Sequence, residues 1–162
     1  MSATFSVAER IVAKDQPQSD TETWVSTVKS SELAHRVMGS RWVEIGASKY
    51  GHYVTRVSIN GAKVWALVDT GASAVAMSYE DAERAGLNPF RLKFSSKIRT
   101  ANGVTRAARG NLKQVVVEGI TVTDVEGMVM RKGAMRGTLL GMSFLRRLNG
   151  FRVEQGVLYL EE

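Results

Sequence analysis

From Arg41 onward, hydrophobic and polar residues alternate along this chain in short runs that end at glycine. Residues 53–59 alternate β-branched side chains with polar ones, as a half-buried strand does. Asn60-Gly61 follows, and this pair is the strongest short-range signal for a two-residue hairpin, because both central positions of a type I′ turn need positive φ. Residues 64–68 supply the return strand. The pattern therefore predicts a β-hairpin near the start of a domain.

Short strands and glycine turns continue to the C-terminus. Further hairpins are predicted around Asn102-Gly103, Glu118-Gly119 and Gln155-Gly156. The expected strands are residues 42–45, 53–59, 64–68, 75–77, 94–100, 104–109, 112–117, 120–125, 127–130, 137–141, 151–153 and 157–160. This succession predicts a mostly β fold, a small closed barrel-like domain with one or two short helices.

Two helices are expected among these strands. Ser78 is the predicted N-cap of a helix over residues 79–85, with Asp81 as an acidic capping partner and Gly86 as the stop. Residues 142–148 are predicted to form the second helix.

Residues 1–40 are polar and weakly patterned. Residues 16–20 read as a loop, and residues 22–37 have the apolar spacing of a helix. We expect residues 1–40 to be a polar lead-in or spacer, and residues 41–162 to be the domain.

Composition narrows the class of protein. The chain has 162 residues, of which 44% are hydrophobic and 23% charged, as in a globular domain with its own core. No apolar run approaches 18 residues, so no membrane span is expected within this chain. Residues 1–20 lack the basic start and apolar centre of a signal peptide.

Cysteine and histidine usage excludes several chemistries. The chain has no cysteine, which removes disulfides, thiolate nucleophiles and cysteine-ligated zinc. His35 and His52 stand far apart and outside any metal-binding spacing. We therefore expect no metal and no cofactor.

The formal net charge is +6. Basic residues are dispersed, and no nucleic-acid-binding motif or interleaved exposed aromatic pattern accompanies them. A solvated basic surface is favoured over a nucleic-acid partner.

The candidate chemistry lies where an apolar strand ends in one acid, Asp69. Thr70 offers a buried hydroxyl that locks the turn or grips a second copy of itself. Gly71 lets the backbone approach the carboxylate and present an N–H to it. Ala72 is small enough for a crowded two-fold axis, and Ser73 can hydrogen-bond the outer carboxylate oxygen. This pattern is typical of an aspartic protease turn, although Asp-Thr-Gly alone is equally a strand-ending turn.

The order of the motifs along the chain favours the aspartic protease turn over an ordinary strand-ending turn. The acid turn 68–73 is followed by Arg-Thr-Ala-Asn-Gly at 99–103, and then by Leu-Leu-Gly-Met-Ser-Phe-Leu at 139–145. This order resembles the retropepsin-like (retroviral-type) aspartic proteases, and more closely their bacterial single-domain relatives of clan AA. The resemblance covers about residues 50–160.

The resemblance implies a role for each motif. Asp69 would be the catalytic acid. The hairpin of Thr100, Ala101, Asn102, Gly103 and Val104 would be the flap that closes over substrate. Leu139, Leu140 and Gly141 would pack beside the catalytic loop and lead into a helix.

The flap departs from the glycine-rich retroviral pattern. Only Gly103 is present, with Arg99 and Arg106 nearby. These arginines either favour acidic residues in the substrate or are solvated hairpin charges, and the sequence favours the second interpretation.

An aspartic protease needs two carboxylates facing one water. The chain has five aspartates, Asp15, Asp20, Asp69, Asp81 and Asp124, and only Asp69 stands in the active-turn pattern. A homodimer with Asp69 at its axis is therefore expected. The strand at 157–160 is either an edge that pairs with its mate or an internal strand of one chain.

The function predicted from the sequence is an aspartic endopeptidase acting on polypeptides. The alternative is a non-catalytic peptide-binding or dimerisation module of the same fold, and a basic nucleic-acid-binding β domain ranks third. Bacterial relatives often carry an N-terminal membrane anchor and work in the periplasm. We expect a periplasmic, anchored protein if an anchor precedes Met1, and a cytoplasmic one otherwise.

Overall fold

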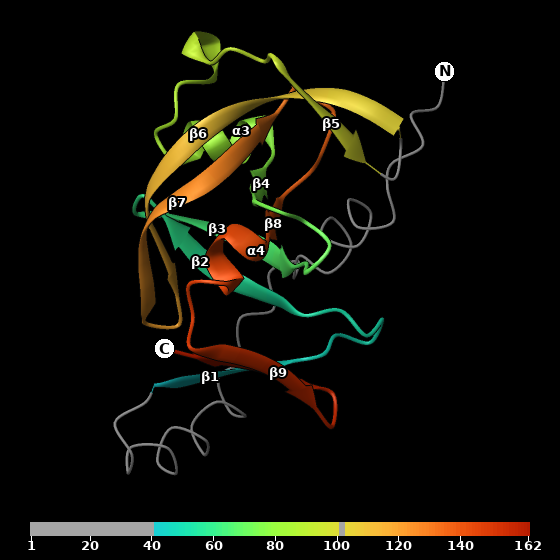
Figure 1. The fold of residues 1–162 in the computed structure, drawn as a ribbon, viewed down its shortest axis with the longest axis vertical. Coiled ribbons are helices and arrows are strands. Elements are labelled where there is room, and N and C mark those ends of the chain that lie inside the picture. Colours follow the sequence, from blue (N-terminus) through green and yellow to red (C-terminus); the bar gives the residue numbers. More distant parts are fainter. Residues whose placement is uncertain (1–40, 101–102) are drawn as a thin grey trace.

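A computed structural model of the chain describes residues 41–100 and 103–162 (Figure 1). The predicted spacer at 1–40, with its loop at 16–20 and helix at 22–37, lies outside the described residues, as do Ala101 and Asn102. In the described part, the strands form one three-stranded and one seven-stranded sheet.

The strands are β1 (Trp42–Gly46), β2 (Val54–Ile59), β3 (Ala62–Val68), β4 (Val75–Met77), β5 (Ser96–Thr100), β6 (Gly103–Val117), β7 (Ile120–Met130), β8 (Thr138–Leu140), β9 (Gly150–Glu154) and β10 (Val157–Glu161). The helices are α3 (Tyr79–Arg84), the short 3-10 helix η1 (Pro89–Arg91) and α4 (Met142–Leu145).

Six strands of the larger sheet close on themselves. Their order is β2-β3-β8-β4-β7-β6, and β2 also pairs with β6 through Val57↔Val117 and Ile59↔Val115. The predicted closed barrel is confirmed. Its interior is apolar, with fully buried side chains that include Ile59, Leu112 and Phe144. β5 extends beyond the closed ring as a hairpin with β6.

The long strands β6 and β7 correct two predicted breaks. We expected separate strands on either side of residues 110–111 and of residue 126, but each pair is one continuous strand. Gly110 and Gly127 pair directly with each other across the ladder. A Cβ on Gly127 would lie 2.9 Å from Cγ of Leu112, so this glycine serves close packing inside the sheet and does not mark a turn.

Three of the predicted hairpin turns are confirmed by their backbone angles. Both central residues have positive φ, as a type I′ turn requires: Asn60 and Gly61 (51° and 91°), Glu118 and Gly119 (47° and 96°), and Gln155 and Gly156 (49° and 78°). Asn60 adds side-chain bonds, since it donates to the carbonyl of Ala85 and accepts from the N–H of Gln114.

The three-stranded sheet has the order β1-β10-β9 and lies beside the barrel, at the bottom of Figure 1. The C-terminal strand is therefore its middle strand, paired on one side with β1 and on the other with β9. The prediction that residues 157–160 form a pairing edge is wrong, and the internal-strand alternative is confirmed. Leu158 and Leu160 point into the core, which explains the central position.

Helix α3 begins as predicted and ends at Arg84, one residue earlier than predicted, with Ala85 as its C-cap. Oγ of Ser78 accepts a hydrogen bond of 3.1 Å from the N–H of Asp81. Beyond Ala85, Gly86 has a φ of +73°, and the N–H of Leu87 donates to the carbonyl of Ala82, which is a Schellman ending.

The predicted capping role of the Asp81 carboxylate is wrong. The N–H of Ser78 donates instead to the carbonyl of Gly137, at 2.9 Å. The Asp81 side chain is buried and bonds to Thr138 and Arg84.

Two smaller differences concern the other helices. Helix α4 ends at Leu145, three residues earlier than predicted, and hydrogen-bonded turns follow it. Helix η1 was not predicted. Its N-cap is Asn88, whose side chain accepts from the N–H of Phe90, and Pro89 occupies its first position.

Candidate active site

Asp69 follows directly on β3, a central strand of the barrel. β3 pairs with β2 on one side and, in parallel, with β8 on the other. The N–H of Asp69 continues this ladder, since it donates to the carbonyl of Leu140 at 3.1 Å. The acid is therefore fixed in position by two rigid strands.

The turn after the acid, residues 69–73, is called here the Asp69 turn. The N–H of Gly71 donates to Oδ1 of Asp69 at 2.8 Å, and a Cβ at Gly71 would lie 3.1 Å from that oxygen. The predicted contact between this glycine and the carboxylate is confirmed. The N–H of Ala72 closes the turn on the carbonyl of Asp69, at 3.2 Å. One carboxylate oxygen is thus held by the backbone of its own turn.

The segment Leu139-Leu140-Gly141 lies against the Asp69 turn. Leu139 and Leu140 stand opposite the last two residues of β3. A Cβ on Gly141 would lie only 2.2 Å from the carbonyl oxygen of Ala74 and 2.7 Å from that of Ala72. The N–H of Met142 then donates to the carbonyl of Ala72 at 2.8 Å. The predicted packing of this segment beside the turn is confirmed.

Ser143 is a supporting residue that the sequence analysis missed. Its hydroxyl accepts from the N–H of Val75 at 2.9 Å and donates to the carbonyl of Glu126 at 2.7 Å. This hydroxyl therefore joins α4 to β4 and β7. A serine in the first turn of a helix gives no sequence signal of such a remote pairing.

Asp81 and Thr138 form a second support behind the site. Thr138 Oγ1 donates to Oδ2 of Asp81 at 3.0 Å, and both residues are buried. Arg84 bonds the other carboxylate oxygen, Oδ1, at 2.8 Å. Thr138 is the first residue of β8, two positions before the carbonyl that holds Asp69, so the pair links α3 to the strand behind the turn.

The Asp69 turn is open to solvent in the single chain. Asp69 and Ala72 are half-buried, while Thr70, Gly71 and Ser73 are exposed. The Thr70 hydroxyl is therefore not buried in the single chain, and its predicted contact with a second copy stays a prediction. Among the described residues, no hydrogen bond joins the hydroxyl of Ser73 to Asp69, and its orienting role stays a prediction.

The β5–β6 hairpin contains the described part of the predicted flap. Thr100 pairs with Gly103, and its Oγ1 donates to the carbonyl of Gly103 at 3.1 Å. Gly103 has a φ of +106°, and Val104 beside it is 67% exposed. Ala101 and Asn102, at the predicted tip, lie outside the described residues.

A small apolar cluster connects this hairpin with the strands near Asp69. Its buried members are Ala107, Met130 and Met135. The half-buried residues Ile98, from β5, Ala76, from β4, and Leu139, from β8, pack against them. Partly exposed apolar side chains therefore extend from beneath the hairpin toward the acid.

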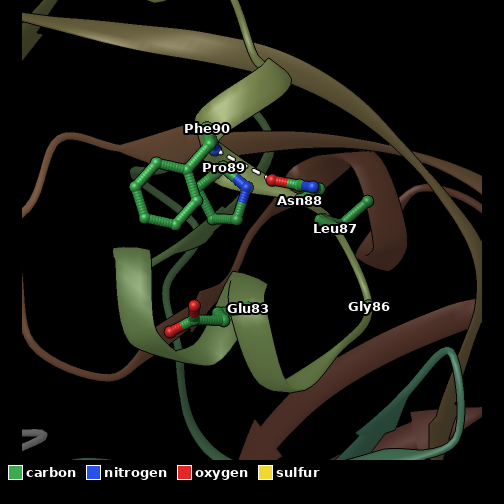
Figure 2. Close-up of a pocket in the computed structure, with 6 residues that line it drawn as sticks. All are labelled: Glu83, Gly86, Leu87, Asn88, Pro89 and Phe90. Carbon is green, nitrogen blue, oxygen red and sulfur yellow. Dashed lines mark hydrogen bonds between the residues drawn. The ribbon is translucent and has the colours of Figure 1, made fainter.

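The described residues hold few other candidate sites. A pocket of about 380 Å³ lies between α3 and η1 and is lined by Glu83, Gly86, Leu87, Asn88, Pro89 and Phe90 (Figure 2). It contains none of the predicted site residues. Asp124 is exposed on β7 and accepts from Nδ2 of Asn111.

Within residues 41–100 and 103–162, no three His, Asp or Glu side chains gather where they could hold a metal ion. The helices of the same segments are too short to cross a bilayer.

Comparison with known proteins identifies the family and the fold of this chain. Residues 55–147 match the model of the family described as "gag-polyprotein putative aspartyl protease". The fold resembles the crystal structure of a retropepsin-like aspartic protease from Rickettsia conorii, with a TM-score of 0.68 and 34% identity over 75% of this chain and 91% of that one. EIAV protease, solved with the inhibitor HBY-793, shares the fold at a TM-score of 0.51 and 21% identity, covering 64% of this chain and 93% of that one.

Two curated bacterial proteins are similar in sequence. "Uncharacterized protein in cobV 5'region" from Sinorhizobium sp is 39% identical over 112 residues, which are 69% of this chain and 48% of that protein. "Uncharacterized protein RP867" from Rickettsia prowazekii (strain Madrid E) is 38% identical over 116 residues, which are 72% of this chain and 49% of that protein. The matched part of the chain spans about half the length of these curated relatives.

Proposed function

This chain belongs to the retropepsin-like family of aspartic proteases, and on that premise we propose that it is one subunit of a homodimeric aspartic endopeptidase. The two Asp69 carboxylates, one from each copy, would face one water molecule at the two-fold axis.

The observation that carries the proposal is the setting of Asp69. Its carboxylate is held by the N–H of Gly71 on a turn that two rigid strands fix and that solvent reaches. The other aspartates among the described residues, Asp81 and Asp124, are bonded elsewhere, the first inside the fold and the second on the outside of β7. One chain thus offers half of the two-carboxylate arrangement that the chemistry needs.

The proposed mechanism follows from placing two such acids together. Two carboxyl groups about 3 Å apart do not both ionise, because their negative charges would repel, so the pair of Asp69 side chains holds one proton. The ionised Asp69 takes a proton from the water, whose oxygen attacks the peptide carbonyl carbon. The protonated Asp69 of the other copy polarises the carbonyl oxygen. The tetrahedral intermediate then collapses: the C–N bond breaks, the leaving amine takes the proton that the first Asp69 received from the water, and the second Asp69 regains the proton that it gave to the carbonyl oxygen. No covalent link to the protein forms in this sequence of steps.

The substrate would lie extended between the Asp69 turn and the β5–β6 hairpin, adding its backbone as a strand. Ala76 on β4, Ile98 on β5 and Leu139 on β8 are half-buried apolar residues that pack against one cluster shared by the hairpin and these strands. We propose that they contact the side chains on either side of the scissile bond and favour apolar residues there.

The test is the substitution Asp69→Asn, which removes the ionisable group and keeps the shape. We expect peptide hydrolysis to fall by at least about 100-fold, with the circular dichroism spectrum and the mass in solution unchanged. Asp124→Asn is the matched control, because it makes the same change at an exposed acid outside the turn, and its activity should equal that of the wild type.

The substrate for this test is an unstructured polypeptide at mildly acid pH, with and without an inhibitor that mimics the tetrahedral transition state. Cleavage that the inhibitor blocks supports the proposal. A folded wild-type dimer that binds the polypeptide without cutting it would point to the peptide-binding module, and full activity of Asp69→Asn would refute the role of the acid.

A further inference from the structure

The positive charge of this chain is concentrated in one stretch. Residues 85–117 contain seven Lys or Arg side chains and no Asp or Glu, whereas the remaining residues together carry a formal charge of −1. This stretch comprises η1, β5 and β6. The net charge of +6 therefore arises from the hairpin that reaches out beyond the barrel and from the segment that leads to it (Figure 1).

Three of these cations share one face of the hairpin. Lys97 stands directly opposite Arg106, and Arg99 is two residues farther along β5. Residues paired across an antiparallel ladder lie on the same face, so the three charges are neighbours. All three are exposed. We call Lys97, Arg99 and Arg106 the cationic flap face.

The opposite face of the same hairpin looks toward the barrel. Ile98 alternates with Lys97 and Arg99 and packs against the apolar cluster that contains Ala107 and Met130. The hairpin is a single layer of two strands, so its charged face and its apolar face meet at one rim. The cationic flap face is thus the outer surface of the hairpin whose inner surface would cover the proposed substrate position.

The pairing of Lys97 with Arg106 lowers the stability of the folded chain when nothing is bound to it. Like charges directly opposite each other in an antiparallel pair are destabilising. Among the ion pairs formed by residues 41–100 and 103–162, none includes Lys97, Arg99 or Arg106, whereas Arg109 on the same strand pairs with Glu126. Cations on an exposed edge strand prevent aggregation, which accounts for Lys97 and Arg99 on β5. It does not account for Arg106, because β5 covers that edge of β6.

We propose that the cationic flap face binds acidic residues of the polypeptide substrate, outside the segment held at Asp69. The inference rests on the proposed function and names its substrate class: polypeptides with Asp or Glu near the cleavage site. A polypeptide is favoured over other anions, because a substrate chain that enters beneath the β5–β6 hairpin would pass along the edge of that hairpin. Nucleic acid fits less well, because the face includes no aromatic ring on which a base could stack.

The experiment compares three peptides that share one cleavable centre and end in four Glu, four Ser or four Lys residues. For the wild type we expect kcat/KM to be about tenfold higher with the Glu peptide than with the Ser peptide, mainly through a lower KM. The advantage should shrink as salt rises toward 1 M, because screening weakens exposed charge pairs.

The matched variants reverse the charge at three positions each. The combined change Lys97→Glu, Arg99→Glu and Arg106→Glu should transfer the preference to the Lys peptide, with each kcat/KM expressed relative to the same variant's value for the Ser peptide. The control change Lys63→Glu, Lys113→Glu and Arg147→Glu alters the net charge equally at exposed sites off this face, and it should keep the preference for Glu.

Binding of the same peptides to the Asp69→Asn protein tests the inference separately from catalysis. If the wild type cuts none of the peptides, the proposed function fails, and tighter binding of the Glu peptide would still support the cationic flap face. Equal affinities for all three peptides would overturn it. It would also be overturned if the flap variant lost affinity for a DNA oligonucleotide or for phosphatidylserine vesicles while its peptide preference stayed unchanged.

Discussion

Two glycines determine how closely other atoms can approach the Asp69 turn. Gly71 lies against the carboxylate itself, and Gly141 lies against the carbonyls of Ala72 and Ala74. Neither position needs a positive φ, so both are glycine for lack of room and not for backbone freedom. At this scale the sequence predicted the contact between Gly71 and the Asp69 carboxylate, because the turn is a contiguous motif, and the catalytic role of Asp69 stays a prediction.

The supporting residues were not predictable in the same way. Ser143 bonds to residues 17 and 68 positions away, and Thr138 bonds to an acid 57 positions away. Such partners meet only because β4, β7, β8 and the two α-helices pack together. The local pattern around Asp81 instead suggested a helix cap, which is a correct interpretation for many acids at that position.

Gly141→Ala tests the close approach. The added methyl group would overlap backbone oxygens, which cannot turn away as a flexible side chain can. We expect the free energy of unfolding to fall by more than about 3 kcal/mol, because overpacking against a rigid backbone costs more than a crowded side chain does. Chemical denaturation measures the change.

Gly46→Ala is the control for that substitution, because nothing lies within 4 Å of a Cβ at this position. Its stability should match the wild type within about 0.5 kcal/mol. Equal stability of the Gly141 and Gly46 variants would contradict the close packing described here.

The shared proton predicts how the rate depends on pH. Hydrolysis needs one proton on the pair of Asp69 carboxylates, so kcat/KM should fall both when the pair gains a second proton and when it loses the first. The profile should be a bell on the acid side of neutrality, measured with an uncharged peptide. A rate that keeps rising into alkaline pH is incompatible with this chemistry.

At the scale of elements, the alternation of apolar and polar residues predicted most strands, and residue pairs that end in glycine predicted the hairpin turns. They failed at Gly110 and Gly127, which lie inside β6 and β7, pair with each other and do not end those strands. They also left open whether residues 157–160 are an edge, because the order of strands in a sheet depends on long-range pairing with β1 and β9. Periodicity reports which face is buried and does not identify the neighbouring strand.

The contact between α3 and β8 can be measured at this scale. Thr138→Val removes the hydroxyl that donates to Asp81 and leaves a buried carboxylate oxygen short of a partner. We expect a loss of about 1–3 kcal/mol in the free energy of unfolding. Thr138→Ser keeps the donor and should recover most of that loss.

A double-mutant cycle assigns the effect to this pair. Asp81→Asn alone should also destabilise, and the two changes together should cost less than their sum, because they remove one interaction. Glu80→Gln, at an exposed acid in the same turn of α3, is the neutral control. Strict additivity of Thr138→Val and Asp81→Asn would show that the hydrogen bond does not couple the helix to the strand.

At the scale of the whole molecule, one chain is a closed barrel with its candidate acid on an open turn. The described residues of a single copy bury an apolar core that the barrel and the three-stranded sheet share. A single copy is incomplete as a two-carboxylate site, because its described residues bring no second acid to Asp69. The sequence predicted a homodimer because only one aspartate, Asp69, stands in the active-turn pattern. The structure adds that Asp81 and Asp124 are bonded to other residues.

The most direct test of the account mixes wild-type and Asp69→Asn subunits. Equal amounts are unfolded together, refolded and allowed to assemble at random, and a small tag on one form shows by mass that mixed dimers have formed. If both Asp69 side chains of a dimer are needed, peptide hydrolysis per total chain should be about a quarter of the wild-type value. Activity of one half, in proportion to the wild-type chains present, would show that each chain works alone and would contradict the shared active site.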